Sequence, residues 1–354
     1  MVAYINGIGL ISPQKTAEDQ EFLAEIIEHN TDYLKCIEPD YKKYLDPLLA
    51  RRMSRLIKMG ITSAKLCLDQ AGIAMPDAII TGTGLGSIED TEKILGAIHL
   101  DQVLLNPTPF IQSTYNTISS QIAIHLKCSG YNSTYVHRSF SFESGLIDGL
   151  MQLEEKNTVN VLVGGIDEMT MTHLSLIRRL GHWKMRPENS LEILESQTKG
   201  ALAGEGSGYF NLSSEKNERS YCRIFEVKTI YKPASNNEIE KEIKNILESN
   251  GLMIDDVDIF LTGMNGVQEF DAIYHILADT LFPDKTLAYF KHLCGEYLTS
   301  TAFALWVAAN ILKRQVVPPV LIIKNKLITN IKNILIYNQY RNVHHSLILL
   351  AECR

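Results

Sequence analysis

Length, composition and charge exclude several classes of protein. The chain has 354 residues, of which 45% are hydrophobic and 21% charged, and its formal net charge is −7. This is the composition of a globular protein rather than a disordered or collagen-like one, and the length suits two domains or two halves of one large domain. No stripe of Lys and Arg is present, so nucleic-acid binding is not predicted.

The cysteines and the N-terminal residues indicate the cellular compartment. Six cysteines are scattered without any CxxC pair, a spacing that predicts free cytoplasmic thiols rather than a zinc site or a disulfide framework. The first 13 residues lack the basic start and long apolar run of a signal peptide. No stretch of about 18 apolar residues predicts a membrane span. We therefore expect a cytoplasmic protein.

Strands and helices alternate along the sequence, which is the pattern of an α/β fold. Apolar runs rich in β-branched residues predict strands, and apolar residues at helical spacing predict helices. In the first part of the chain, the expected strands are 2–11, 78–81, 134–136, 159–163 and 206–212, and the expected helices are 51–71, 88–98 and 143–155. In the second part, the expected strands are 222–231, 257–261, 286–290, 333–337 and 346–350, and the expected helices are 238–250, 268–281 and 297–312.

Two glycine-rich segments need an explanation, and neither predicts a cofactor site. Residues 82–86 (GTGLG) follow a predicted strand, but their spacing is not G-x-G-x-x-G and no acidic residue stands about 20 residues later, so we interpret them as a tight turn. In residues 204–208 (GEGSG), glycine predicts a close approach of two backbones. No HxxxH or HExxH pair predicts a metal site.

Several segments, taken in order, resemble the β-ketoacyl synthase branch of the thiolase superfamily. The resemblance covers nearly the whole chain. It implies a thiolase-like, five-layered αβαβα fold with two pseudo-duplicated halves, residues 1–213 and 221–354, joined near 213–220. The segments that carry it are 4–13 (YINGIGLISP), 53–55 (MSR), 81–86 (TGTGLG), 106–110 (NPTPF), 163–168 (VGGIDE), 200–208 (GALAGEGSG) and 251–258 (GLMIDDVD).

The three catalytic positions of that family depart from its pattern. Alignment on residues 144–145 places Phe142 where the family has its nucleophilic Cys, whereas a gapless count back from 164–165 gives Ser139. The spacing from two flanking Asp residues places Gly263 at the first catalytic His. The position five residues after Lys291, where the second His is expected, is Glu296.

These replacements predict that the chain does not condense acyl groups. Decarboxylative condensation needs a thiolate to carry the acyl group and two imidazoles to stabilise the enolate. Phe, Gly and Glu supply neither group. The resemblance then implies a non-condensing homologue that partners an active synthase, as a chain-length factor does in polyketide, aryl polyene or fatty acid biosynthesis.

The resemblance also implies partners and further residue roles. We expect a heterodimer with an active β-ketoacyl synthase, or a homodimer, together with an acyl carrier protein and no cofactor. Lys291 and Glu205 are expected to be structural. The residues expected to line or cap the acyl tunnel are Phe110, Tyr115, Phe142, Gln339 and Tyr340, the last two in a loop where Gln339, Arg341 and Asn342 replace family glycines.

Two other functions remain open from the sequence. The chain could be an acyltransferase or synthase-like enzyme with a displaced nucleophile, for which Ser139, Ser141 and Cys294 are the candidates. It could also be a homodimeric module that binds an acyl ligand or an acyl carrier protein.

Overall fold

The computed structural model describes residues 3–17, 21–100, 104–156, 158–324 and 330–353. Eleven of the described strands form one hydrogen-bonded sheet in the order β13-β12-β11-β14-β15-β10-β1-β9-β6-β4-β5. The strands of the first half are β1 (Ala3–Ile11), β4 (Ala78–Gly82), β5 (Tyr131–Tyr135), β6 (Asn160–Asp167) and β9 (Gly206–Ser213). Those of the second half are β10 (Arg223–Tyr231), β11 (Ile259–Thr262), β12 (Thr286–Tyr289), β13 (Ile322–Lys324), β14 (Asn333–Tyr340) and β15 (His344–Ala351).

The strand order repeats between the two halves. The order β1-β9-β6-β4-β5 corresponds to β10-β15-β14-β11-β12, with the same antiparallel and parallel pairings in each. The first strands of the two halves, β1 and β10, pair antiparallel over two residues each. The halves are therefore pseudo-duplicated. The division at 1–213 and 221–354 stays a prediction, although the repeat changes over between β9 and β10.

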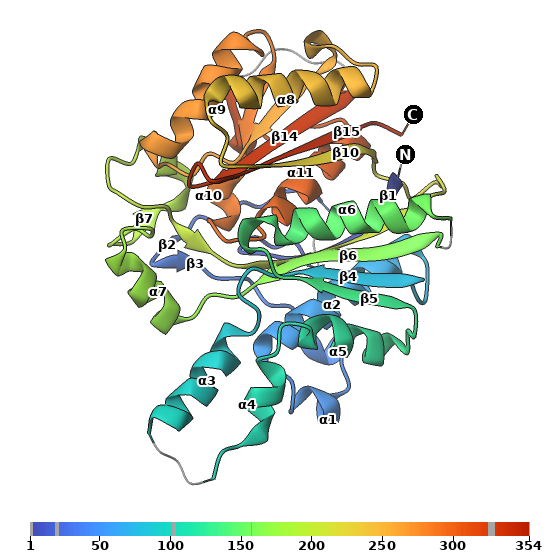
Figure 1. The fold of residues 1–354 in the computed structure, drawn as a ribbon, viewed down its shortest axis with the longest axis vertical. Coiled ribbons are helices and arrows are strands. Elements are labelled where there is room, and N and C mark those ends of the chain that lie inside the picture. The colour runs from blue at the N-terminus through green and yellow to red at the C-terminus, as the bar shows by residue number, and fades with distance from the viewer. Residues whose placement is uncertain (1–2, 18–20, 101–103, 157, 325–329, 354) are drawn as a thin grey trace.

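The helices cover the sheet in layers (Figure 1). Helices α2 and α5 lie on the outer face of the first half, α6 and α11 lie between the halves, and α8 and α9 cover the outer face of the second half. This is the expected five-layered αβαβα fold. The helices are α1 (Pro47–Ala50), α2 (Arg55–Ala71), α3 (Ile88–His99), α4 (Pro107–Gln112), α5 (Thr117–Leu126), α6 (Ser141–Glu154), α7 (Met171–Arg179), α8 (Asn236–Ser249), α9 (Gln268–Thr280), α10 (Lys291–Cys294) and α11 (Thr301–Arg314).

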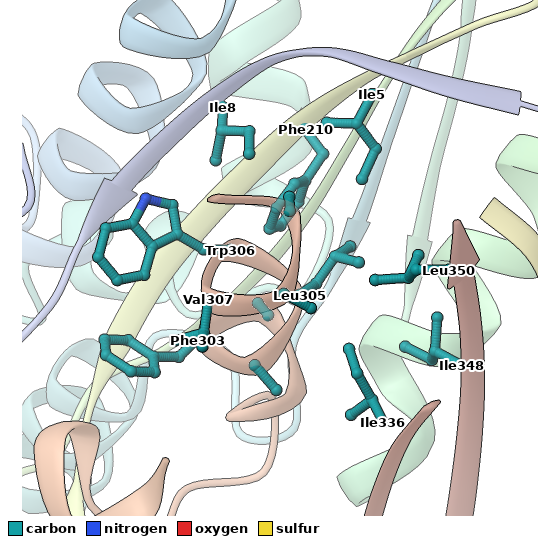
Figure 2. Packing of buried hydrophobic residues seen from close by; sticks show 14 of the residues in the cluster. Ile5, Ile8, Phe210, Phe303, Leu305, Trp306, Val307, Ile336, Ile348 and Leu350 are labelled. Carbon is teal, nitrogen blue, oxygen red and sulfur yellow. The ribbon is translucent and has the colours of Figure 1, made fainter. Parts of the chain in front are cut away.

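The central helix α11 holds the two halves together. Every residue from 301 to 312 is buried, as expected for a helix that is apolar on all sides. Figure 2 shows its side chains between strands of both halves. The labelled residues of this cluster are Phe303, Leu305, Trp306 and Val307 of α11, Ile5 and Ile8 of β1, Phe210 of β9, Ile336 of β14, and Ile348 and Leu350 of β15.

Most expected elements are present, and the differences have local causes. The helix expected from residue 51 begins at Arg55, because the Ser54 side chain caps it by accepting a hydrogen bond from the Ile57 N–H. The helix expected from residue 297 begins at Thr301, and β5 begins three residues earlier than expected, at Tyr131. Residue 2, the expected start of the first strand, lies outside the described residues. No helix in the described ranges is long and apolar enough to cross a membrane.

Gly82 allows the central helix α6 to start against the end of β4. A Cβ at Gly82 would overlap the Ser141 carbonyl group and would lie 2.6 Å from the Phe142 nitrogen. These neighbours are backbone atoms, so they cannot rotate away as a flexible side chain could.

We expect Gly82→Ala to destabilise the protein by about 1–3 kcal/mol, because the overlap forces the start of α6 to move. Gly96→Ala is the matched control. Gly96 lies in α3, and a Cβ there would meet no atom within 4 Å, so that substitution should be neutral or stabilising by up to about 1 kcal/mol. Urea denaturation of the two variants measures both effects. Equal stability of Gly82→Ala and the unmodified chain would contradict the packing described.

Candidate functional site

Phe142 is a core residue. It is the second residue of α6, which begins directly after the turn 138–140, and its side chain is fully buried. Its ring lies 5.7 Å from the ring of Phe210, and a Cβ at Gly165 would come within 2.9 Å of it. The ring therefore packs between the two halves and fills space at the start of α6. A role of Phe142 in an acyl tunnel stays a prediction.

The space beside Gly263 is also filled. Gly263 follows β11, and its N–H donates to the Tyr337 carbonyl at 3.0 Å. A Cβ at Gly263 would overlap the side-chain oxygen of Asn338 and lie 2.9 Å from the Tyr274 hydroxyl. The Asn338 amide is itself fixed by donating to the Thr301 hydroxyl at 2.8 Å. An imidazole at position 263 would therefore need Asn338 to move.

Glu296 forms a buried ion pair with Lys291. The Lys291 Nζ lies 2.6 Å from the Glu296 Oε2, and the two side chains are 1% and 4% exposed. The Asn265 side-chain amide donates to the same carboxylate oxygen at 2.8 Å. Lys291 also contacts the Gln339 carbonyl at 3.4 Å. The Glu296 carboxylate is therefore committed to holding together the loops that contain these residues.

Glu143 is a buried carboxyl that sequence analysis did not identify. It lies beside Phe142, is fully buried, and accepts a hydrogen bond from the Ser346 hydroxyl at 2.9 Å. Burial raises its pKa to about 7, against the opposing effect of the Thr301 and Ser346 hydroxyls. Helical spacing could have predicted that Glu143 is buried. It precedes the buried Leu146 by three residues and therefore lies on the same face of α6.

The three candidate displaced nucleophiles lack an activating base. The Ser141 hydroxyl donates to the Arg138 carbonyl at 2.6 Å and accepts from the His137 N–H, so it fixes the turn before α6. Ser139 is buried, and its hydroxyl has no hydrogen-bond partner in the described part of the chain. Burial raises the pKa of the Cys294 thiol well above its usual range, which favours an unreactive thiol. Among the residues described, none of the three side chains forms a hydrogen bond with a histidine ring.

The other residues expected to line the tunnel differ in burial: two are exposed and one is buried. Phe110 and Tyr115 are 62% and 52% exposed, and the Tyr115 ring covers Gly86. Gln339 is buried and its side chain is engaged, because it donates to the Phe270 carbonyl and accepts from the Asn342 N–H. Tyr340 lines the cavity between the turn at residues 84–85, α7 and the β14–β15 hairpin. Contact of Phe110 and Tyr115 with an acyl chain stays a prediction.

The turn that follows Tyr340, the last residue of β14, has a backbone conformation typical of glycine. Arg341 and Asn342, where the resemblance implies glycines, have φ angles of 56° and 52°. This left-handed region disfavours most side chains.

Glu205, which was expected to be structural, accepts hydrogen bonds from both backbone and side-chain donors. Glu205 accepts hydrogen bonds from Arg55 at 2.8 Å, from the Cys36 N–H at 2.9 Å and from the Met169 N–H at 3.0 Å. A Cβ at Gly204 would overlap the Cys294 carbonyl, so the two backbones approach closely there, as expected. These contacts are those of a structural segment.

The glycine turn at residues 82–86 is structural. The Gly84 and Leu85 N–H groups donate to the Asp167 carboxylate at 2.8 and 3.0 Å. These are the groups that a dinucleotide phosphate would need. Asp167 occupies them, so the turn is not a phosphate site.

Comparison with known proteins identifies the fold. Residues 30–174 match the family model of the β-ketoacyl synthase N-terminal domain. No curated protein matches the chain.

Solved structures are similar over the whole length of the chain. They include the ishigamide ketosynthase/chain length factor, with a TM-score of 0.83, 15% identity and coverage of 100% of this chain and 99% of that one. A β-ketoacyl synthase from Burkholderia phymatum STM815 has a TM-score of 0.80, 13% identity and 99% coverage of both chains. A ketosynthase in complex with its chain length factor from Xenorhabdus doucetiae gives a TM-score of 0.80 at 14% identity, covering 99% of this chain and 98% of that one. The chain is thus β-ketoacyl synthase-like, and the expected thiolase-like fold is confirmed.

The raised pKa of Glu143 predicts a pH-dependent stability. A carboxyl whose pKa rises from 4.5 to about 7 on folding takes up a proton in the folded state. Its contribution to stability is therefore present below pH 4.5 and is lost as the pH rises through 7. Glu143→Gln removes this loss. Between pH 4.5 and pH 8, the free energy of unfolding of the variant should therefore rise by up to about 3 kcal/mol relative to that of the unmodified chain.

Urea denaturation at both pH values measures that difference. The exposed Glu154, near the end of the same helix, gives the matched control Glu154→Gln. Its pH profile should parallel that of the unmodified chain. A parallel profile for Glu143→Gln as well would show that Glu143 is ionised at pH 5 in the folded protein.

Proposed function

We propose that this chain is a non-condensing β-ketoacyl synthase homologue that partners an active synthase as a chain-length-factor-like subunit. The proposal rests on the side chains found at and beside the three catalytic positions that the resemblance implies. The Phe142 ring fills the core, Asn338 takes the space beside Gly263, and Glu296 is paired with Lys291. The pathway would be of the fatty acid or polyketide type.

Each replacement removes a different part of the condensation chemistry. A phenyl ring at Phe142 cannot carry an acyl group, and Gly263 has no side chain to polarise a thioester carbonyl. The Glu296 carboxylate would repel the negative charge that develops on an enolate. A synthase partner would therefore have to supply the nucleophile and both imidazoles.

The exposed edge of β5 supports a dimer. In the described sheet, β5 is the last strand and pairs only with β4 (Figure 1). Its free edge presents unpaired backbone groups, which favour pairing with another strand. Tyr131, its first residue, and Val136, the residue after its end, are 44% and 41% exposed. We infer that this edge continues the sheet into a partner synthase, or into a second copy when the chain is expressed alone.

The arm formed by α3 and α4 supports a role at such an interface. In Figure 1 these helices project from the layered body. Phe110 lies on α4, and Tyr115 lies between α4 and α5, both with exposed rings. We propose that these rings reach the partner's acyl tunnel and limit the product length by steric contact. An acyl carrier protein would deliver the acyl groups to the partner.

A homodimeric acyl-binding module is the second candidate. The same free β5 edge supports self-association. The displaced-nucleophile enzyme has less support, because the contacts of Ser139, Ser141 and Cys294 provide no base.

Substitution of Val136 tests the proposed interface. Co-expression with a ketosynthase from the same organism should give a stable complex, and Val136→Asp should weaken it at least tenfold, because a carboxylate would be buried at the interface. The exposed Val316, beyond the end of α11, gives the matched control Val316→Asp, which should leave the complex intact. Sedimentation velocity measures both. A monomer at micromolar concentration that recovers no ketosynthase would contradict the proposal.

A further inference from the structure

One face of the free β5 edge carries hydroxyl groups that gather around a carboxylate. Side chains alternate along a strand, so Tyr131, Ser133 and Tyr135 share one face of β5. The Tyr131 hydroxyl donates to the Asp148 Oδ2 of α6 at 3.1 Å, so this is the face that α6 covers (Figure 1). The opposite face lies against α5, to which the Asn132 side chain donates. The carboxylate of Asp148 therefore lies at the edge where a partner strand would pair.

The Asp148 carboxylate is buried without a cation. The residue is 6% exposed. It accepts hydrogen bonds from the Tyr131 hydroxyl and, at 3.2 Å, from the Gln152 side-chain amide. Burial and the charge of Asp148 raise the pKa of the Tyr135 hydroxyl to about 12. Within the described ranges, Asp148 forms no ion pair. Buried carboxylates are normally paired with a cation, so this one lacks a counter-charge.

A second copy of the chain would not supply that counter-charge. Neither β5 nor α6 contains a Lys, Arg or His, and α6 carries two further carboxyls, Glu143 and Glu154. His137 and Arg138, which follow β5, lie beside β15 and the cavity that Tyr340 lines. Two copies that pair through the same edge present the same surfaces to each other. Self-pairing would therefore bury a second Asp148 and add no cation.

The neighbourhood of Asp148 would exclude water once a partner covers it. Ile147 is partly buried and Met151 is 53% exposed, and both lie within one helical turn of Asp148. A covering strand would place these apolar side chains and the carboxylate in a medium of low dielectric constant. Such a medium strengthens the attraction between the carboxylate and a cation, and it increases the cost of a carboxylate that stays unpaired.

We propose that the β5 edge takes a partner strand that places an Arg or Lys side chain against Asp148, and that it thereby selects this partner over a second copy of the chain. The inference rests on the proposed function and deepens it, because it names the group that the synthase must supply. Tyr131 and Gln152 hold the carboxylate while the partner's cation donates to it. The β5 backbone can pair with any strand, whereas this ion pair determines which strand is chosen.

Two substitutions remove the unpaired charge by different routes. Asp148→Asn keeps the side-chain shape and an oxygen that can accept from the Tyr131 hydroxyl. Gln152→Lys keeps Asp148 and supplies a cation at a partly exposed position four residues later on the same helix. Each variant should bind a ketosynthase from the same organism at least tenfold more weakly than the unmodified chain does. Each should also self-associate at least tenfold more tightly, because the unpaired carboxylates no longer oppose pairing.

Sedimentation velocity over a concentration series measures both dissociation constants. The matched control is Glu248→Gln, which makes the same change in net charge at an exposed position of α8, on the outer face of the second half. This control should change each dissociation constant less than twofold.

Two results would overturn the inference. They are an unchanged affinity for the ketosynthase in a folded variant, and self-association of a folded variant that is no tighter than that of the unmodified chain. Gln152→Lys leaves the buried Asp148 in place, so the test holds even if Asp148→Asn does not fold. Failure of the proposed function gives a different result, since the unmodified chain would then form no complex with the ketosynthase, and both proposals would fall.

Discussion

The buried ion pair between Lys291 and Glu296 is the interaction on which the centre of the molecule depends. Removal of one partner of such a pair leaves an uncompensated buried charge, which typically costs about 3–5 kcal/mol. The pair also positions its surroundings, since Asn265 donates to the Glu296 carboxylate and the Gln339 carbonyl contacts Lys291. The loops at 263–267 and 338–342 are thereby tied to α10. A carboxylate held in this way is a structural anion, and it fixes how the rest of this region packs.

The space around that pair is filled by side chains. The fold needs the starts of α6 and α11 to meet the ends of the strands, and Phe142 and Asn338 now pack there. The space at Phe142 and beside Gly263 is therefore occupied by side chains. The cavity beside Tyr340 lies apart from this core. In our account, the fold and the β5 edge are retained because they form a partner surface.

The sequence predicted most of the fold and less of the site. Periodicity located α11 and the β strands because their burial follows directly from the apolar pattern. The spacing around Gly263 and Glu296 marked the positions that the structure places in contact with Asn338 and Lys291. The direction of the Phe142 ring could not be predicted, because it depends on Phe210, which is distant in sequence. The cavity was missed for the same reason, since its walls come from several separate loops.

The central claim is that this chain carries no acyl group, and intact-mass spectrometry tests it most directly. The purified chain is incubated with acyl thioesters of an acyl carrier protein, beside an active ketosynthase that acquires the acyl adduct under the same conditions. The account predicts no adduct on this chain, because Phe142 replaces the nucleophile and burial keeps the Cys294 thiol protonated. A stoichiometric adduct mapped to Ser139, Ser141 or Cys294 would contradict it.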